Sequence, residues 1–305
     1  MIPQKAKHIT LKFFSLFSAV RAYNILVLVC AQYLAAIFIF SPTKSLKDVV
    51  FDMHLLFLVL ASVFVIAGGY IINNFYDDAV DKINRPLKAG LDNYVKQATK
   101  LRLYFFLNFT GFCFGILISP RAALFFAVYI FAIWFYSHKL KKYPFIGVIS
   151  ATVLTILPFF AVFVYYENFS EIIFVYAVYL FLVIMVRELI KDLQNMRGAI
   201  ASDYSTLSLV YGERKTKQIA ILALLFTGIP ITILFSYPAL SYMRYYFYFA
   251  IIVLVFVGFY LWKSKTTKHY RILHNILKLL LFVGVLCLTF IDTSLLLDKV
   301  IDILN

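Results

Sequence analysis

The stretch that decides the fold reads INNFYDDAVDKINRP and runs from Ile72 to Pro86. It follows a long apolar run and holds three of the chain's few carboxylates. Residues four apart lie on one face of a helix, so Asn73, Asp77 and Asp81 would present their oxygen atoms together. Such a face, with cationic side chains close behind it, suits a hard divalent cation that carries an anionic ligand. An ordinary solvated loop between two membrane spans is the alternative interpretation.

Outside this stretch the chain is strongly apolar. Of its 305 residues, 63% are hydrophobic and only 14% are charged, and the mean hydropathy is +0.88. A soluble domain carries about a quarter charged residues. Apolar runs of about 20 residues recur, which is the length that a helix needs to cross a bilayer. The composition therefore predicts an all-α integral membrane protein rather than a β-barrel, whose strands alternate apolar and polar residues.

The apolar runs predict nine membrane spans in a single domain of residues 1–305. We place them at residues 20–40, 53–76, 101–119, 122–138, 145–165, 170–190, 217–236, 243–262 and 275–297. When the span ends are included, 24 of the 29 Lys and Arg residues fall on the side of the N-terminus. Cytoplasmic segments carry an excess of Lys and Arg, so we expect a cytoplasmic N-terminus and an outside C-terminus.

The placement of the Lys and Arg residues also explains the net charge of +14. It indicates membrane topology and contact with anionic lipids, and we expect no nucleic-acid partner. A bacterial inner membrane is the expected location. Residues 1–19 lack a signal-peptide cleavage pattern and are predicted to form an interfacial amphipathic helix. The three cysteines, at positions 30, 113 and 287, lie inside apolar runs with no metal or disulfide spacing.

A second polar cluster closes the sixth span and reads RELIKDLQNMRG, from Arg187 to Gly198. Glu188, Asp192 and Asn195 fall at i, i+4 and i+7, again on one helical face. Both clusters follow even-numbered spans, so they lie on the same side of the membrane. Two carboxylate-bearing clusters joined by cations can hold Mg²⁺ between the protein and a diphosphate. The metal would neutralise charge on a leaving diphosphate and let an allylic carbon–oxygen bond ionise.

Two further segments carry polar groups near the same side. Asn24 lies about one turn into the first span, where a polar group needs a partner; a helix–helix hydrogen bond and a substrate contact are equally compatible with it. Tyr136 is followed by Lys139 and Lys141, which could present a hydroxyl and an ammonium to a phosphate. Taken alone, that segment is better explained by an aromatic belt residue followed by positive-inside lysines.

With these motifs, the sequence resembles the UbiA superfamily of intramembrane prenyltransferases over nearly its whole length. The family's first motif, N-D-x-x-D-x-x-x-D, is matched by Asn73, Asn74, Asp77 and Asp81. The second, R-E-x-x-K-D-x-x-D-x-x-G-D, is matched by Arg187, Glu188, Lys191, Asp192, Asn195, Gly198 and Ala199. Arg21 and Asn24 match an R-P-x-N start of the first helix. The R-E-x-x-K-D run is most similar to the geranylgeranylglycerol-phosphate geranylgeranyltransferase branch.

The resemblance implies a nine-helix bundle with a central cavity open to the cytoplasmic side. It also implies Mg²⁺-dependent transfer of a prenyl group from a prenyl diphosphate to a small or lipid acceptor. Carried over position by position, Asp77, Asp81 and Asp192 would hold Mg²⁺ and serve catalysis. The substrate-contacting residues would be Asn24, Asn73, Arg85, Tyr136, Lys139 or Lys141, Arg187, Lys191 and Asn195. Neither the acceptor nor the oligomeric state follows from the resemblance.

The chain departs from the family pattern at three acidic positions. Asn74 stands in place of a frequent Asp, and Asn195 and Ala199 replace acids of the second motif. These departures keep open a non-catalytic relative that binds an isoprenoid or quinone lipid. A small transporter is the third hypothesis, and it ranks last because the polar residues gather at span ends rather than through the bilayer depth.

Overall fold

The computed structural model describes residues 15, 17–92, 94–202 and 204–291. The interfacial helix expected at residues 1–19 lies almost wholly outside this part. Within it, nine helical segments are long and apolar enough to cross a membrane, which confirms the predicted all-α membrane bundle. The α-helices are α2 (Ala22–Ala35), α3 (Leu46–Val50), α4 (Met53–Tyr76), α5 (Asp78–Asn84), α6 (Pro86–Asp92), α7 (Gln97–Ile118), α8 (Pro120–His138), α9 (Pro144–Tyr166), α10 (Glu171–Ile200), α11 (Leu207–Phe226), α12 (Gly228–Phe235), α13 (Met243–Lys263) and α14 (Thr267–Cys287).

Three span boundaries differ from the sequence prediction by eight residues or more: the sixth span ends at Ile200 instead of 190, and two spans begin earlier than predicted. The seventh span begins at Leu207 instead of 217, and the ninth begins at Thr267 instead of 275. Charged residues in the first two turns of each of these helices lower the local hydropathy, and hydropathy marks only the part of a helix that lies in hydrocarbon. The helical start of α14 is fixed by another signal, since the Thr266 side chain caps it by accepting from the His269 N–H.

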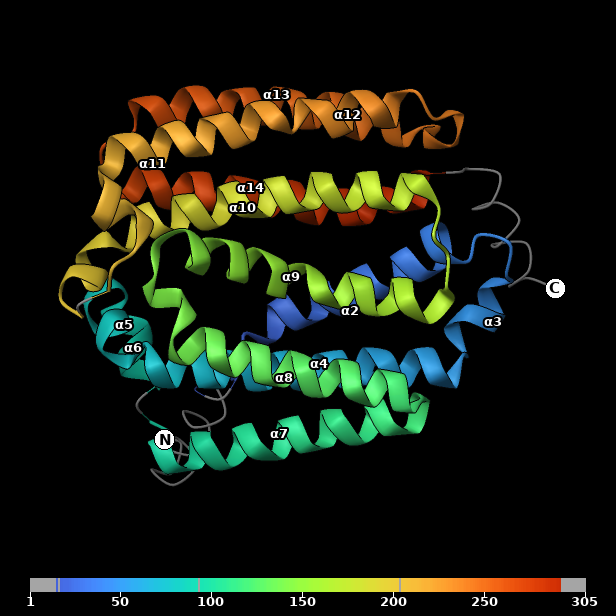
Figure 1. Ribbon diagram of the computed structural model, residues 1–305, viewed down its shortest axis with the longest axis horizontal. Coiled ribbons are helices and arrows are strands. Elements are labelled where there is room, and N and C mark those ends of the chain that lie inside the picture. The colour runs from blue at the N-terminus through green and yellow to red at the C-terminus, as the bar shows by residue number, and fades with distance from the viewer. Residues whose placement is uncertain (1–14, 16, 93, 203, 292–305) are drawn as a thin grey trace, which may run out of the picture.

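Two adjacent glycines let α4 approach two neighbours closely. A Cβ on Gly68 would lie 2.8 Å from Nδ2 of Asn108 on α7, and a Cβ on Gly69 would lie 2.9 Å from the Ile133 side chain on α8. Small residues at such positions bring helix backbones together in the membrane. Asn108 satisfies its own amide by donating to the Tyr104 carbonyl. The packing of α4 on α7 and α8 forms one side of the bundle (Figure 1).

Pro158 lies inside α9, where a proline bends a helix. A proline has no N–H, so the carbonyl of Leu154, four residues earlier, loses its helical partner. The Tyr129 hydroxyl on α8 donates to that carbonyl at 2.9 Å. Gln32 on α2 donates to the Pro158 carbonyl and to the Ser62 hydroxyl on α4, each at 3.0 Å. Four helices are therefore joined by polar contacts beside the bend.

The short helices α5 and α6 lie at the end of the bundle where α4 finishes (Figure 1). Asn84, the last residue of α5, joins this segment to α10. Its amide donates to the Asn195 carbonyl and accepts from the Gly198 N–H, both at 3.2 Å. A Cβ on Gly198 would lie 2.3 Å from the Asn84 amide nitrogen, so only glycine permits this approach. The glycine of the second motif thus has a packing role.

Candidate active site

A cavity of about 1580 Å³ opens between the helices. Ligand pockets commonly measure about 300 to 1,000 Å³, so this one has room for a long ligand or for two. Part of its wall is aromatic and comes from α8, α9, α10 and α13, through Tyr129, Phe159, Tyr176, Tyr179, Tyr246 and Phe247. The other part is polar and holds eight Lys or Arg and four Asp or Glu side chains. The lining thus suits molecules with an anionic head and a long apolar tail.

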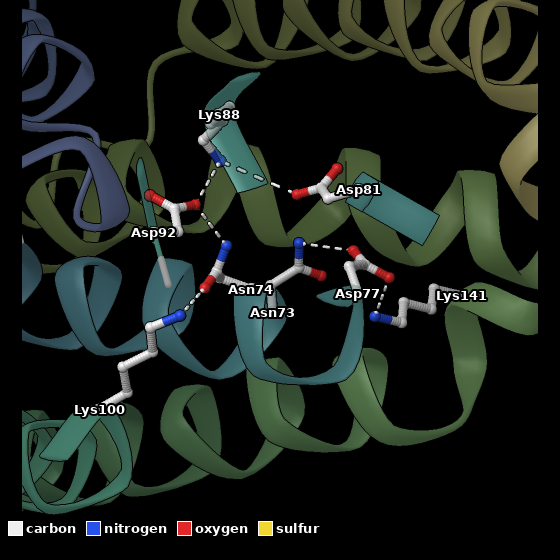
Figure 2. Close-up of polar contacts among 8 residues, drawn as sticks. All are labelled: Asn73, Asn74, Asp77, Asp81, Lys88, Asp92, Lys100 and Lys141. Carbon is white, nitrogen blue, oxygen red and sulfur yellow. Dashed lines mark hydrogen bonds and ion pairs between the residues drawn. The ribbon is translucent and has the colours of Figure 1, made fainter. Parts of the chain in front are cut away.

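The first motif lines the polar part. Although α4 ends at Tyr76, i to i−4 backbone hydrogen bonds continue from Asp77 to Asn73 and from Asp81 to Asp77. The three side chains therefore face the same cavity. Asn73 donates to Oδ2 of Asp77 at 2.9 Å, and Lys141 Nζ lies 2.6 Å from Oδ1 (Figure 2).

Lys141 rather than Lys139 reaches the site. The short 3₁₀ turn Leu140–Lys142 directs Lys141 into the cavity, while Lys139 is exposed and outside its lining. Tyr204 also contacts Asp77, donating its hydroxyl to Oδ1 at 3.3 Å. Burial, and then the charge of Asp77, raises the pKa of Tyr204, so its hydroxyl keeps the proton that it donates.

The second motif lines the same cavity from α10. Glu188 pairs with Arg187 at 3.1 Å and with Lys191 at 2.8 Å. Asp192 accepts the Ser208 backbone N–H at 2.8 Å, in the first turn of α11, where helix N–H groups favour an anion. Asn195, which replaces an acid of the family pattern, also lines the cavity. The second motif therefore offers Asp192 as its cavity-facing carboxylate without a cationic partner within 4.0 Å in the described chain.

These residues can be tested for their fit to Mg²⁺. Asp77, Asp81 and Asp192 line one cavity together with the amides of Asn73 and Asn195. Among the described residues, no three His, Cys, Asp or Glu side chains lie close enough to hold a metal by themselves. Mg²⁺ usually takes one or two carboxylates and completes its shell with phosphate oxygens and water. The residues therefore fit a magnesium ion that takes some of its ligands from the protein and the others from a diphosphate and water.

The remaining predicted residues also line the cavity. Asn24 donates to the Tyr70 hydroxyl at 3.3 Å, so it has a helix–helix partner as well as a cavity-facing position. Tyr136, Arg187 and Lys191 are lining residues too. Burial lowers the pKa of the Arg85 guanidinium, and repulsion from nearby arginines lowers it further against the attraction of Asp81. Lys139 is the one predicted residue that the structure places elsewhere.

A buried network behind the first motif escaped the sequence analysis. Asn74 donates to Oδ2 of Asp92 at 2.8 Å and accepts from Lys100 Nζ at 3.0 Å. Lys88 lies 3.5 Å from the same Asp92 oxygen and 3.9 Å from Asp81 (Figure 2). Asn74, Asp92 and Lys100 are only 7%, 2% and 1% exposed, and none of the three lines the cavity.

This network explains the departure at Asn74. A carboxylate there would face buried Asp92, and two close carboxylates repel each other. The amide instead accepts from Lys100 and donates to Asp92, and Asp92 in turn contacts Lys88 at the cavity wall. The spacing of Lys88 and Asp92, four residues apart, is the only signal in the sequence that could have indicated this network.

Comparisons with known proteins agree with the predicted fold and family. The model of the UbiA prenyltransferase family matches residues 29–286. The digeranylgeranylglyceryl phosphate synthase of Methanobrevibacter smithii is 29% identical over 82% of this chain and 87% of its own. That of Thermococcus gammatolerans is 33% identical over 50% of this chain, and the matched part spans 55% of that relative.

Solved structures share the fold at low sequence identity. A digeranylgeranylglyceryl phosphate synthase has a TM-score of 0.62 and 18% identity, over 92% of this chain and 99% of the other. A UbiA homologue from Archaeoglobus fulgidus, bound to DMAPP and Mg²⁺, has a TM-score of 0.65 and 13% identity, over 89% and 99% of the two chains. With the family model covering most of its length, this chain belongs to the UbiA prenyltransferase family.

Proposed function

We propose that the protein transfers a prenyl group, with Mg²⁺, from a prenyl diphosphate to an acceptor within the membrane. The observation that carries this proposal is the division of one cavity into a cationic part with both acidic motifs and a part lined by aromatic rings. A prenyl diphosphate has the same division into an anionic head and an apolar tail. The DMAPP and Mg²⁺ bound by the Archaeoglobus homologue support the choice of donor and metal.

Individual side chains receive distinct roles in this proposal. Lys141 and Arg85 bind the diphosphate, and Asp77, Asp81 and Asp192 hold Mg²⁺. Bound Mg²⁺ would neutralise the charge that develops on the leaving diphosphate. Asn73 and Tyr204 orient the Asp77 carboxylate through their hydrogen bonds, which would keep it directed toward Mg²⁺. Preorganised charges of this kind lower the barrier because they need no rearrangement during the reaction.

The transfer itself breaks one bond and forms another. The bond between the allylic carbon and the diphosphate oxygen breaks, and its electron pair stays on the diphosphate. A lone pair of the acceptor forms the new bond to that carbon, and the acceptor's proton passes to the released diphosphate. The ring faces of cavity residues such as Tyr176 and Phe247 would stabilise positive charge on the allylic group.

For the acceptor, we propose a glyceryl phosphate that already carries one prenyl chain and reacts through its free hydroxyl. The support is the name of the relatives, which are synthases of digeranylgeranylglyceryl phosphate. A non-catalytic lipid-binding role is the second candidate. It is favoured by the neutral residues Asn195 and Ala199 at two acidic positions of the family motif.

Purified protein in lipid vesicles can test this function. Supplied with geranylgeranyl diphosphate, geranylgeranylglyceryl phosphate and Mg²⁺, it should release diphosphate and form a product with both chains, identified by mass. Chelation with EDTA should stop the reaction. Asp77→Ala should reduce the rate by about 100-fold or more, the usual effect of removing a preorganised electrostatic group. Binding of the donor without any diphosphate release would instead support the lipid-binding role.

A matched control for Asp77 lies next to it in the chain. Asp78 is outside the cavity lining and pairs with exposed Lys82 at 2.7 Å. Asp78→Ala should therefore leave the transfer rate nearly unchanged. Equal activity of the Asp77 and Asp78 variants would contradict the proposed site.

A further inference from the structure

The cations of the cavity fall into two groups. Four of the eight lie within 4.0 Å of a carboxylate: Lys88, Lys141, Arg187 and Lys191. The other four have no carboxylate at that distance among the described residues: Arg21, Arg85, Arg271 and Lys278. The acids of the two motifs therefore balance one group of cations and leave the other unbalanced.

Two of the unbalanced cations come from one face of α14. Arg271 and Lys278 lie seven residues apart, with His274 between them, and all three line the cavity. Another face of α14 packs Leu273 and Leu277 into the core, where both are fully buried. The helix is thus oriented so that its cationic face meets the cavity. Positive-inside topology accounts for cations near this end of the span, but not for their position inside a cavity.

Arg21 joins this group from the start of α2. It has φ 51° and ψ 52°, a left-handed conformation that is unfavourable for residues with a Cβ and is often found at functional sites. This backbone directs the guanidinium over the Tyr70 ring, 4.9 Å from its centre. Lys278 Nζ lies 3.9 Å from the centre of the Tyr23 ring, and Tyr23 belongs to the first turn of α2.

The charged neighbours of these cations indicate how close they lie to the first motif. Arg21 lies within electrostatic reach of Lys278 and of Arg85. Arg85 is within electrostatic reach of Arg271 and also of Asp81, so it is close both to the unbalanced cations and to the first motif. Like charges held this close repel one another, and a bound anion would relieve the repulsion.

We propose that Arg21, Arg271 and Lys278, here called the α2–α14 cluster, form a second anion site that binds the phosphate monoester of a lipid acceptor. This inference rests on the proposed function, in which the donor diphosphate occupies the side of the cavity that carries Asp77 and Lys141. Two anionic substrates in one cavity each need cations, and the α2–α14 cluster supplies those of the acceptor. Arginines suit this role because the guanidinium offers several donors to phosphate oxygens.

The test compares phosphorylated and dephosphorylated forms of one lipid. Binding of geranylgeranylglyceryl phosphate, of its dephosphorylated diol and of geranylgeranyl diphosphate is measured separately on the purified full chain. The double variant R271Q/K278Q should weaken binding of the phosphate lipid at least tenfold. Binding of the diol and of the diphosphate should change less than twofold. In steady-state transfer, the KM for the phosphate acceptor should rise while the KM for the diphosphate stays the same.

Two control variants separate this role from general effects of charge and folding. Lys265 and Lys268 lie just before Arg271 but outside the cavity lining, so K265Q/K268Q should bind all three lipids as the wild type does. The charge-conserving R271K/K278R should recover most of the lost binding, which a misfolded protein would not.

Two outcomes would overturn the inference. Equal loss of diphosphate and phosphate-lipid binding would make the α2–α14 cluster part of the donor site. Unchanged binding in R271Q/K278Q would make these residues ordinary topology cations. If the wild type binds the phosphate lipid through the cluster but forms no product, the proposed transfer fails while the second anion site stands.

Discussion

Lys141 and Lys139 show how the local backbone selects one of two similar side chains. Only Lys141 lies in the cavity, 2.6 Å from Asp77. We expect Lys141→Met to raise the KM for prenyl diphosphate at least tenfold, because a hydrogen bond to a charged group typically contributes about 1.5 to 3 kcal/mol. Lys139→Met should behave as the wild type in the same assay. A larger effect at Lys139 would place the diphosphate elsewhere.

The buried network at Asn74 makes a second prediction at this scale. Asn74→Asp restores the family's usual residue but places a carboxylate 2.8 Å from Oδ2 of buried Asp92. We expect the free energy of unfolding to fall by about 1 to 3 kcal/mol, because one of the two carboxylates must take up a proton or lose its contact.

Adding Asp92→Asn should reverse much of that loss, since the network again holds one carboxylate and one amide. Thermal unfolding in detergent measures both changes. Additive destabilisation in the double variant would show that the two side chains do not depend on each other.

These residues mark what a sequence can and cannot predict about a site. The spacing of Asn73, Asp77 and Asp81 indicated one shared face, and the continuing i to i−4 hydrogen bonds keep it although α4 ends between them. The partner of Asn74 could not be predicted, because Asp92 meets it only after α6 has folded back. The choice of Lys141 depends on a 3₁₀ turn that no residue pattern marks.

At the scale of elements, the joint between α5 and α10 depends on a glycine. Gly198→Ala would place a Cβ 2.3 Å from the Asn84 amide, which must then give up its bonds to α10. Overpacking of this kind costs about 1 to 3 kcal/mol, so the unfolding midpoint should fall. Gly90→Ala on α6 is the control, since a Cβ there meets no atom within 4 Å. Equal midpoints for the two variants would contradict the role of this joint.

Helix ends were less predictable than helix centres. Hydropathy located the apolar middle of every span, but it missed the first two turns of α11 and α14, which carry charged residues such as Glu213 and Arg271. Those turns matter because Arg271 belongs to the α2–α14 cluster. A helical spacing of cations in the last span, at Arg271 and Lys278, was present in the sequence and could have indicated a cavity-facing surface.

At the scale of the molecule, the alternation of the nine spans in the described chain brings the ends of α4 and α10 and the start of α14 to one end of the bundle (Figure 1). The bias of Lys and Arg predicts that this end faces the cytoplasm. With the native cysteines replaced by Ser, Lys265→Cys should react with a membrane-impermeant maleimide only after the cells are opened. Ser241→Cys, between α12 and α13, should react in intact cells. The reverse pattern would invert the topology.

The number and order of the spans followed from composition alone, because the bilayer fixes the length of an apolar helix. The cavity did not follow, because it depends on which helices touch. Gly68 and Gly69 decide two of those contacts, and their neighbours Asn108 and Ile133 are far away in the sequence.

The bend at Pro158 has a consequence for substrate traffic. The carbonyl that proline leaves free in α9 is already bonded to Tyr129 of another helix, and the Pro158 carbonyl is bonded to Gln32 of a third. We expect this bend to be rigid, because separating the helices would leave the Leu154 and Pro158 carbonyls without hydrogen-bond partners in hydrocarbon. We expect α2, α8 and α9 to keep their spacing through turnover. Long-chain lipids must then enter and leave where the wall has no such bonds.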